Sequence, residues 1–267
     1  MADLAGLRDQ LLALDRVVVA FSGGADSALL AWAAHDTLGA DRALAVTAVS
    51  PSLAVAERRD CAALAAEWGL RWDEVVTDEL ERAAYRRNDG DRCAHCKDAL
   101  MDALAPAAAA EGATVTLGVN LDDLGDHRPG QAAAAGRGAV FPLVEAGLTK
   151  ADVRAMSRRL GLRTWDKPAA ACLASRVPYG TPVSFGVLDQ VGRAEEGLRA
   201  LGFDALRVRH YRDLARIEVP VGHLATVLAQ REAVVATVRR AGYRYVTVDL
   251  EGLRSGNLND ALLPRSG

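Results

Sequence analysis

A short apolar run followed by a glycine-rich turn is the feature that most constrains this chain. Residues 17–21 (Val-Val-Val-Ala-Phe) are typical of a buried strand, and an apolar helix begins just after the turn Ser22-Gly23-Gly24. The two glycines lack a Cβ, so the backbone can turn tightly and approach a ligand closely. Free N–H groups at the start of the helix form an anion site, to which Ser22 and Ser27 add hydroxyl donors.

Asp26 is unexpected in a phosphate-binding turn, because its carboxylate would repel the bound phosphate. It fits as an N-terminal cap of the helix or as a ligand of the Mg²⁺ that accompanies a nucleotide. The turn is not a Walker A loop, which needs a Gly-Lys-Ser/Thr ending that is absent here. An ordinary strand–turn–helix corner is the alternative, but the motif is specific and favours phosphate binding.

The composition is that of a soluble globular protein. The 267 residues, 50% of them hydrophobic, can bury a full core in one large domain or two smaller ones. A formal net charge of −3 gives no electrostatic reason to expect nucleic-acid binding. No apolar stretch is long enough to span a membrane, and the first residues do not resemble a signal peptide, so we expect a cytoplasmic protein.

Strand and helix patterns alternate through the first part of the chain, after a short amphipathic helix at 1–15. The expected elements are strands near 17–21, 42–50, 72–77 and 114–120, and helices at 54–68, 97–110 and, after a Thr149 cap, 150–161. This alternation predicts an α/β fold with a parallel sheet, whose ligands bind at the carboxyl ends of the strands.

The order changes after about residue 184. The expected elements are a helix at 184–201, strands at 206–211, 215–219 and 243–249, and helices across 221–241. The Arg212-Asp213 turn predicts an antiparallel hairpin between the first two of these strands. We therefore expect a larger domain over 1–170, a smaller α+β domain over 171–253, and a poorly ordered tail over 254–267.

Cys172 is the strongest candidate for a catalytic residue. It follows Gly161 in a loop of more than twenty residues, and such loops are usually functional. Lys167 and Arg176 are near it in sequence, and positive neighbours favour the thiolate that a nucleophile or sulfur donor needs. An inert core cysteine is the alternative for such a residue taken alone.

Four cysteines do not make a disulfide framework in a chain of this size. Cys93 and Cys96 form a Cys-x-x-Cys pair, which is half of a four-ligand zinc site whose other half is missing. Together with Cys172 they can bind three irons of a [4Fe–4S] cluster and leave the fourth open. A redox dithiol or an incidental helix start are the alternatives, and Cys61 is interpreted as a core residue.

Charged side chains come after one of the expected strands and lie on another. Asp123 or Asp126 comes after the strand at 114–120 and is a candidate for binding Mg²⁺ or orienting a substrate, with plain turn formation as the alternative. Arg207 and Arg209 are two residues apart on a strand, so both point to one face and suit a phosphate or a dicarboxylate. A solvated, charge-paired sheet face is the alternative for that pair.

These motifs resemble those of one family. Ser-Gly-Gly-x-Asp-Ser resembles the PP-loop of the ATP pyrophosphatase superfamily. Over nearly its whole length the chain is similar to the ATP-dependent sacrificial sulfur transferases of the LarE type. The matching segments are 22–27, 91–97, 118–123, 128–130, 145–150, 165–168, 172–176, 207–209 and 215–218.

The resemblance implies a PP-loop domain of the adenine nucleotide alpha hydrolase-like, Rossmann-like type and an enzyme of nickel-pincer nucleotide synthesis. Such an enzyme uses ATP and Mg²⁺ to adenylate a carboxylate of pyridinium-3,5-biscarboxylic acid mononucleotide, and releases pyrophosphate. A thiolate, here Cys172, displaces AMP to give a thioester. Cleavage of the Cβ–S bond then leaves a thiocarboxylate on the substrate and dehydroalanine in the protein.

The resemblance also implies roles for individual residues. Those expected to bind ATP and its metal ion are Ser22, Gly23, Gly24, Asp26, Ser27, Lys97, Asn120 and Asp123. Those expected to bind the substrate are Ser175, Arg176, Arg207 and Arg209. Glu195 and Glu218 match acidic positions near a metal at subunit contacts. Because family members form trimers and hexamers, a homo-oligomer is expected.

The extra cysteines bear on the source of the sulfur. Family members with a single cysteine are consumed after one turnover, whereas cysteine-rich members bind a [4Fe–4S] cluster through three cysteines and pass on a cluster-bound sulfide. Because Cys93, Cys96 and Cys172 are all present, we favour the cluster version, in which Cys172 is a ligand rather than the donor.

Other function classes compete with this one. A PP-loop tRNA thiolase would need a basic face or a zinc-ribbon RNA module, and neither is visible in the sequence. An amidotransferase-type synthetase would need a glutaminase or an ammonia-channel partner. A non-enzymatic nucleotide-binding module is disfavoured by the intact phosphate-loop motif and by Cys172.

Overall fold

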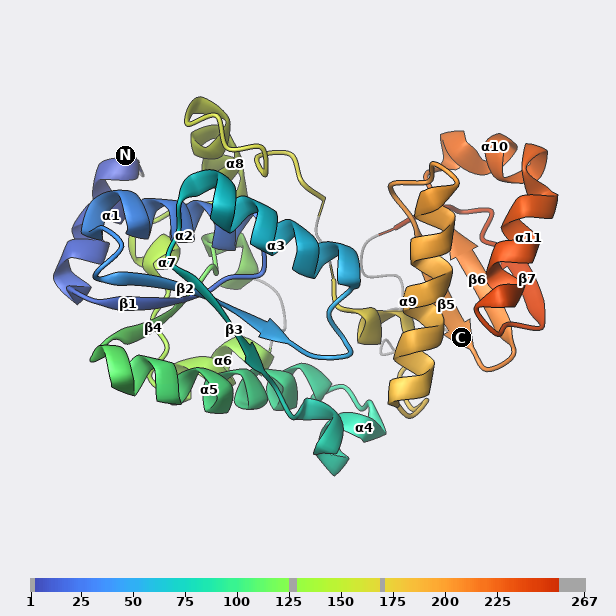
Figure 1. Cartoon of the computed structure of the whole chain (residues 1–267), viewed down its shortest axis with the longest axis horizontal. Helices are drawn as coiled ribbons and strands as arrows, with labels where there is room; N and C mark the ends of the chain where they lie inside the picture. The colour runs from blue at the N-terminus through green and yellow to red at the C-terminus, as the bar shows by residue number, and fades with distance from the viewer. Residues whose placement is uncertain (1–2, 125–128, 169–170, 255–267) are drawn as a thin grey trace, which may run out of the picture. The chain divides into compact units, whose positions relative to one another are not determined.

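We describe a computed structural model of the chain over residues 3–124, 129–168 and 171–254 (Figure 1). Asp126 and residues 255–267 of the expected tail lie outside the described residues. The chain divides into two compact units, each described by itself. The first comprises Met1–Ser50, Val55–Glu79 and Cys93–Ala170, and the second comprises Pro51–Ala54, Leu80–Arg92 and Ala171–Gly267.

The described residues of the first unit are built on a four-stranded parallel sheet in the order β3-β2-β1-β4. Its strands are β1 (Val17–Ala20), β2 (Ala43–Val49), β3 (Trp72–Val76) and β4 (Thr114–Leu117). The central strand β1 pairs with β2 on one side and β4 on the other, both in parallel. The expected parallel α/β sheet is confirmed, so the carboxyl ends of these strands meet at one edge.

Helices cover both faces of this sheet (Figure 1). They are α1 (Leu4–Leu14), α2 (Ala25–Leu38), α3 (Val55–Trp68), α5 (Arg92–Glu111), α6 (Pro129–Gly136), α7 (Pro142–Glu145) and α8 (Lys150–Arg159). Helix α5 begins at Arg92, five residues before the expected start at residue 97, so Cys93 and Cys96 are already helical. The side chain of Asp152 and that of Thr149 cap α8 reciprocally, which confirms the predicted cap.

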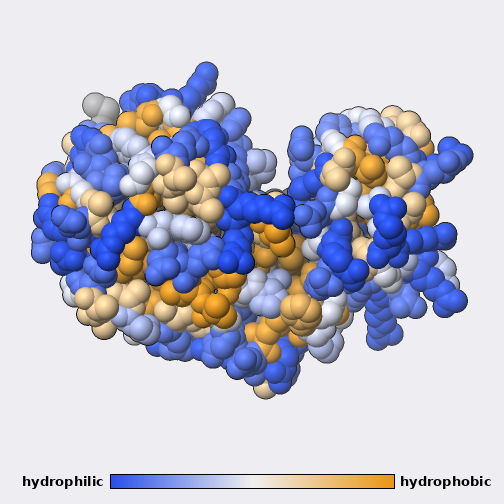
Figure 2. All heavy atoms as spheres, viewed as in Figure 1, coloured by the Kyte–Doolittle hydropathy of each residue, from blue (hydrophilic) through white to orange (hydrophobic). Residues whose placement is uncertain are grey.

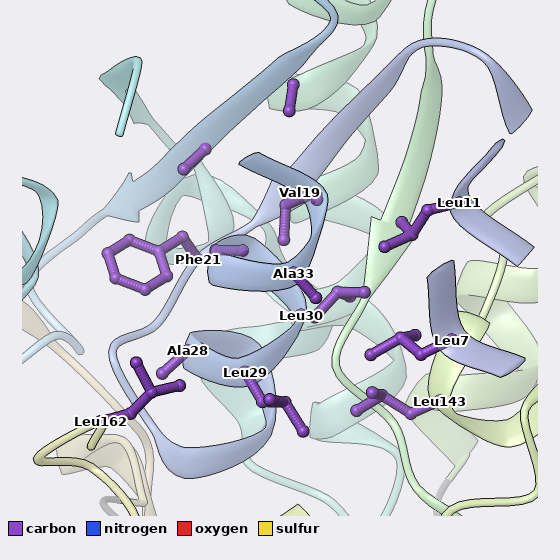
Figure 3. Close-up of a cluster of buried hydrophobic side chains, with 14 of the residues drawn as sticks. Leu7, Leu11, Val19, Phe21, Ala28, Leu29, Leu30, Ala33, Leu143 and Leu162 are labelled. Carbon is purple, nitrogen blue, oxygen red and sulfur yellow. The ribbon is translucent and has the colours of Figure 1, made fainter. Parts of the chain in front are cut away.

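Two cores form because strand side chains point alternately to opposite faces of the sheet. Val17, Val19 and Phe21 pack on the side of α1, α2 and α8, where Figure 3 shows Val19 and Phe21 among leucines of these layers. Val18 and Val46 pack on the other side, against Met101 and Leu104 of α5 and Ala134 of α6. Strand β1 and most of β2 and β4 are therefore buried between the two layers of helices.

The described residues of the second unit carry a three-stranded sheet in the order β5-β6-β7. Its elements are η1 (Glu79–Glu81, which begins at the unit boundary), α4 (Ala83–Arg87), η3 (Leu173–Arg176), α9 (Phe185–Ala200), β5 (Arg207–Tyr211), β6 (Leu214–Glu218), η4 (Val221–His223), α10 (Leu224–Ala229), α11 (Arg231–Arg240) and β7 (Tyr245–Val248). Strands β5 and β6 form the predicted antiparallel hairpin. The core of this unit joins Val208 and Ile217 to Leu198 of α9 and Val238 of α11.

The surfaces of both units are mixed in character. Figure 2 shows hydrophilic side chains over much of the visible face of each unit, with apolar side chains between them. In the part of the chain that the structure describes, no helix combines the length and the apolar character needed to cross a bilayer.

Candidate active site

The phosphate loop lies between the end of β1 and the start of α2. Gly23 has a φ of +67°, a left-handed conformation that favours glycine. The hydroxyls of Ser22 and Ser27 are 3.0 Å apart, and the Ser22 N–H donates to the Ser27 hydroxyl at 3.2 Å. Gly24 is the N-cap of α2 and offers no side chain to its first N–H groups. The loop therefore presents hydroxyls and backbone donors at a helix N-terminus, as an anion site requires.

Gly118 lets the end of β4 approach this loop closely. A Cβ at Gly118 would lie 2.6 Å from the backbone nitrogen of Ser27 and 2.8 Å from its Cα. No side chain fits there, so glycine is required at this position. Gly118 lies in one of the matching segments, and its role was not predicted, although a glycine that directly follows a strand is a signal of close backbone approach.

The Asp26 carboxylate lies in the first turn of α2 and has a partner for each oxygen. Oδ1 accepts a hydrogen bond from Asn120 Nδ2 at 3.0 Å, and Oδ2 pairs with Lys150 Nζ at 2.5 Å. Because Gly24 occupies the cap position, the alternative that Asp26 is the cap of the helix is wrong. Lys150 was named within a matching motif, but its contact with Asp26 was not foreseen.

The segment after β4 folds into a tight turn, η2 (Leu121–Leu124). Asn120 Oδ1 accepts from the N–H groups of Asp122 and Asp123, and Asp123 Oδ2 accepts from the N–H of Asn120 at 3.2 Å. Asp122 Oδ2 accepts from the N–H of Lys150 at 2.9 Å. These contacts support the turn-forming alternative for Asp123, while the buried Asn120 also holds Asp26.

Cys93, Cys96 and Lys97 lie in the first turns of α5. Cys93 is exposed and Cys96 is half-buried, and their spacing of three residues puts them on one face of the helix. The helix packs closely on α6, since a Cβ at Gly130 would lie 2.8 Å from the Cys93 carbonyl oxygen. No group of three or more His, Cys, Asp or Glu side chains within residues 3–124, 129–168 and 171–254 is arranged to hold a metal. The three-cysteine cluster thus stays a prediction.

In the second unit, the main chain around Cys172 is held while its side chain is exposed. Nη1 of the buried Arg176 donates to the carbonyls of Ala171 at 2.7 Å and Cys172 at 3.3 Å. The same nitrogen donates to Ser175 Oγ, and the Ser175 N–H donates to the Cys172 carbonyl at 2.9 Å. Arg176 was expected to bind the substrate. In the structure it holds the main chain of the loop that carries Cys172.

Two fully buried glutamates neutralise two of the expected substrate-binding arginines. Arg176 forms a bidentate pair with Glu195, at 2.8 and 3.1 Å. Arg209 forms another with Glu218, at 2.9 Å for both contacts, and donates Nη1 to the Ser175 carbonyl at 2.8 Å. Such burial of ionised groups requires pairing of this kind. The metal-binding role of Glu195 and Glu218 stays a prediction, because in this geometry their partners are arginines.

Arg207 differs from these two arginines. Its side chain is half-buried and, among the residues described, hydrogen-bonds only to the Arg254 carbonyl, at 3.0 Å. Burial lowers the pKa of its guanidinium, and the nearby charges of Arg209 and Arg176 lower it further. An anion bound there would stabilise the charged guanidinium, and of these three arginines Arg207 is the one with no carboxylate partner among the described residues.

Cys61 and Lys167 lie against the phosphate loop. Cys61 is buried in the core, as expected, and burial raises the pKa of its thiol to about 11. Lys167 was expected to act on the Cys172 thiol, and the structure does not support that role. Its Nζ lies 3.1 Å from the Gly23 oxygen, 2.6 Å from Asp60 Oδ2 and 2.8 Å from Glu57 Oε2, so its charge is already compensated.

Known proteins match the chain over nearly its full length, although no family model matches it. An uncharacterized protein of Synechocystis sp. is 45% identical, with 97% of both chains covered. An uncharacterized protein of Methanocaldococcus jannaschii is 25% identical, with 90% of this chain and 91% of that protein covered. The pyridinium-3,5-bisthiocarboxylic acid mononucleotide synthase of Lactiplantibacillus plantarum is 39% identical over 98% of this chain and 97% of its own. The chain therefore belongs to the LarE family of sulfur transferases.

Proposed function

We propose that this protein is an ATP-dependent sulfur transferase of nickel-pincer nucleotide synthesis. Its substrate would be a carboxylate of pyridinium-3,5-biscarboxylic acid mononucleotide, which it converts to a thiocarboxylate. The observation that carries the proposal is the full-length similarity to a synthase named for the bisthiocarboxylic acid mononucleotide. The phosphate loop and the exposed Cys172 supply groups that this chemistry needs.

The phosphate loop supports the adenylation step. A substrate carboxylate oxygen attacks the α-phosphorus of ATP, and the bond to the leaving pyrophosphate breaks. The N–H groups at the start of α2 and the hydroxyls of Ser22 and Ser27 would bind the pyrophosphate. Asp26, whose carboxylate here pairs with Asn120 and Lys150, would hold Mg²⁺ in place of the Lys150 ammonium, and the ion would offset phosphate charge. Lys97, Asn120 and Asp123 complete the proposed nucleotide set.

Cys172 supports the sulfur step in its sacrificial form. Its thiolate attacks the acyl carbon, the acyl–oxygen bond breaks and AMP leaves. A base then removes the Cα proton, the Cβ–S bond breaks, and the sulfur leaves with its electron pair as the thiocarboxylate. Arg207 and Arg209 would hold the substrate near Ser175 and Arg176. Of these four, Arg207 has the fewest competing contacts within the described residues.

We also propose the cluster version of this step as a second candidate. Two thiols on one helix face of α5, one exposed and one half-buried, favour it. Cys93, Cys96 and Cys172 would each bind one iron of a [4Fe–4S] cluster, which supplies a transferable sulfide when bound. The proposal includes a homo-oligomer of three or six chains, which the family resemblance implies. It also includes a cytoplasmic location, which is inferred from the sequence.

Pyrophosphate release and iron content test the proposal. We expect wild-type protein, prepared without oxygen, to release pyrophosphate from ATP only when the mononucleotide substrate is present, and Cys172→Ala to form no thiocarboxylate. About four irons per chain, lost in Cys93→Ala, would establish the cluster version. Iron-free active protein whose spent form is lighter by the mass of H₂S would establish the sacrificial version. Steeply salt-dependent tRNA binding would instead favour a tRNA thiolase.

A further inference from the structure

The ammonium group of Lys167 joins three parts of the first unit. It contacts the carbonyl oxygen of Gly23 in the phosphate loop at 3.1 Å, and the carboxylates of Asp60 and Glu57 on α3 at 2.6 and 2.8 Å. Its side chain is 17% exposed. Burial by itself lowers the pKa of this ammonium, but the hydrogen bonds to Asp60 and Glu57 outweigh it and the pKa is raised. Lys167 therefore stays charged and fixed in place.

The contact with Gly23 determines the direction of the next N–H group. In a trans peptide the C=O of one residue and the N–H of the following residue point in opposite directions. Because the Gly23 carbonyl points to Lys167, the Gly24 N–H points away from it. Within the described residues no group accepts a hydrogen bond from that N–H. It is therefore free for an anion at the start of α2.

The loop is also supported from the side of α3. A Cβ at Gly23 would lie 3.0 Å from the sulfur of Cys61 and 3.7 Å from Lys167 Nζ. The Cys61 side chain is fully buried, so it leaves the Gly23 peptide little room to turn over. Lys167 attracts the Gly23 carbonyl oxygen, and the Cys61 sulfur limits the space for the peptide to turn over. Together they keep the Gly23–Gly24 peptide in one orientation.

We infer that Lys167 is a positioning residue for the pyrophosphate of ATP, acting through the Gly23–Gly24 peptide and not by touching phosphate itself. This inference rests on the proposed ATP-dependent function. Lys167 is near Cys172 in sequence, but its contacts assign it to the nucleotide site. In this assignment the Gly24 N–H would donate to the pyrophosphate and not to the α-phosphate, so loss of Lys167 should weaken the binding of ATP and pyrophosphate and spare that of AMP.

Calorimetric titration of the full chain with ATP, pyrophosphate and AMP in the presence of Mg²⁺ tests this. For Lys167→Met we expect about tenfold weaker binding of ATP and pyrophosphate, the size of one lost hydrogen bond to a charged group, and less than about twofold change for AMP. Arg163→Met is the matched control. Arg163 pairs with the same Asp60 at 2.7 Å and with Glu67, and it should leave all three affinities unchanged.

Each outcome decides the inference. If wild type fails to bind ATP, the proposed function fails and the inference with it. If wild type binds ATP and Lys167→Met binds ATP and pyrophosphate equally well, or loses AMP to the same degree, Lys167 is only structural and the inference alone is overturned. Should Lys167→Met fold poorly, Lys167→Met/Glu57→Gln restores the local charge balance and is expected to show the same selective loss.

Discussion

The two units hold their candidate residues by opposite means. In the first, backbone N–H groups and hydroxyls come together because Gly23 and Gly118 have no side chains. In the second, the guanidinium groups of Arg176 and Arg209 are buried and fixed by glutamates. The first site thus depends on steric room and the second on charge pairing. Substitutions should therefore damage them by different mechanisms.

The largest difference should be that between the thiol of Cys61 in the first unit and the thiol of Cys172 in the second. At pH 8, a thiol with a pKa of about 11 is thiolate to only about one part in a thousand, and Cys61 is also buried, whereas Cys172 is exposed. We expect iodoacetamide to modify Cys61 at least about a hundredfold more slowly than Cys172. Peptide mass spectrometry measures both rates, with the chain unfolded in guanidinium as the control in which the rates converge. If iodoacetamide modified Cys61 and Cys172 at equal rates in the native protein, the predicted difference between the two thiols would be wrong.

Removing a buried charge partner should give the largest loss of stability. Glu195→Ala leaves Arg176 buried without its carboxylate, and we expect a loss of about 3–5 kcal/mol in the free energy of unfolding. Asp189→Ala is the control on the same helix, because its pair with Arg193 is exposed and worth less than about 1 kcal/mol. Urea titration followed by circular dichroism measures both. Similar losses would show that pairing does not hold the second unit.

Adding a methyl group at Gly118, beside the phosphate loop, should lower the free energy of unfolding by somewhat less than the loss of Glu195 does. Gly118→Ala forces a Cβ against the backbone of Ser27, and we expect a loss of about 1–3 kcal/mol and of ATP binding. Gly136→Ala is the control, because nothing lies within 4 Å of its added Cβ. All four tryptophans lie in the first unit, so their fluorescence follows its unfolding. If Gly118→Ala were as stable as the wild type, the predicted clash with the Ser27 backbone would be wrong.

The smallest expected effect is a dependence of stability on alkaline pH. The Cys61 thiol has a folded pKa of about 11, above its ordinary value of 9.0, so the unfolded chain loses this proton first. Its contribution is fully present below pH 9 and is lost as the pH rises towards 11, about 1 kcal/mol by pH 10. Urea titrations between pH 8 and pH 10 measure the slope. Cys61→Ala should flatten it, and an unchanged slope would exclude Cys61 as the cause.

Much of the fold follows from local patterns. The strand–turn–helix corner, the parallel sheet, the hairpin at Arg212-Asp213 and the cap at Thr149 all depend on neighbouring residues, and all are confirmed. Helices α4, α6 and α7 were not foreseen. The last of these is a single short turn that periodicity cannot reveal.

The partners in the site could not be predicted in the same way. Lys150 contacts Asp26 across 124 positions, and Lys167 contacts Gly23 across 144. No spacing rule reaches that far. Strand alternation put Arg207 and Arg209 on one face, but only the structure shows that a glutamate neutralises Arg209.

The support around Cys172 has a consequence for the pool of protein copies in a cell. Arg176 holds that loop through carbonyl oxygens, which every amino acid carries, so the loop does not depend on the side chain at position 172. If the sulfur leaves from Cys172 itself, we expect spent copies to keep this loop and the arginines beside it in place, and so to go on binding the substrate. They would then compete with fresh copies, and the yield of product would depend on how quickly spent chains are degraded.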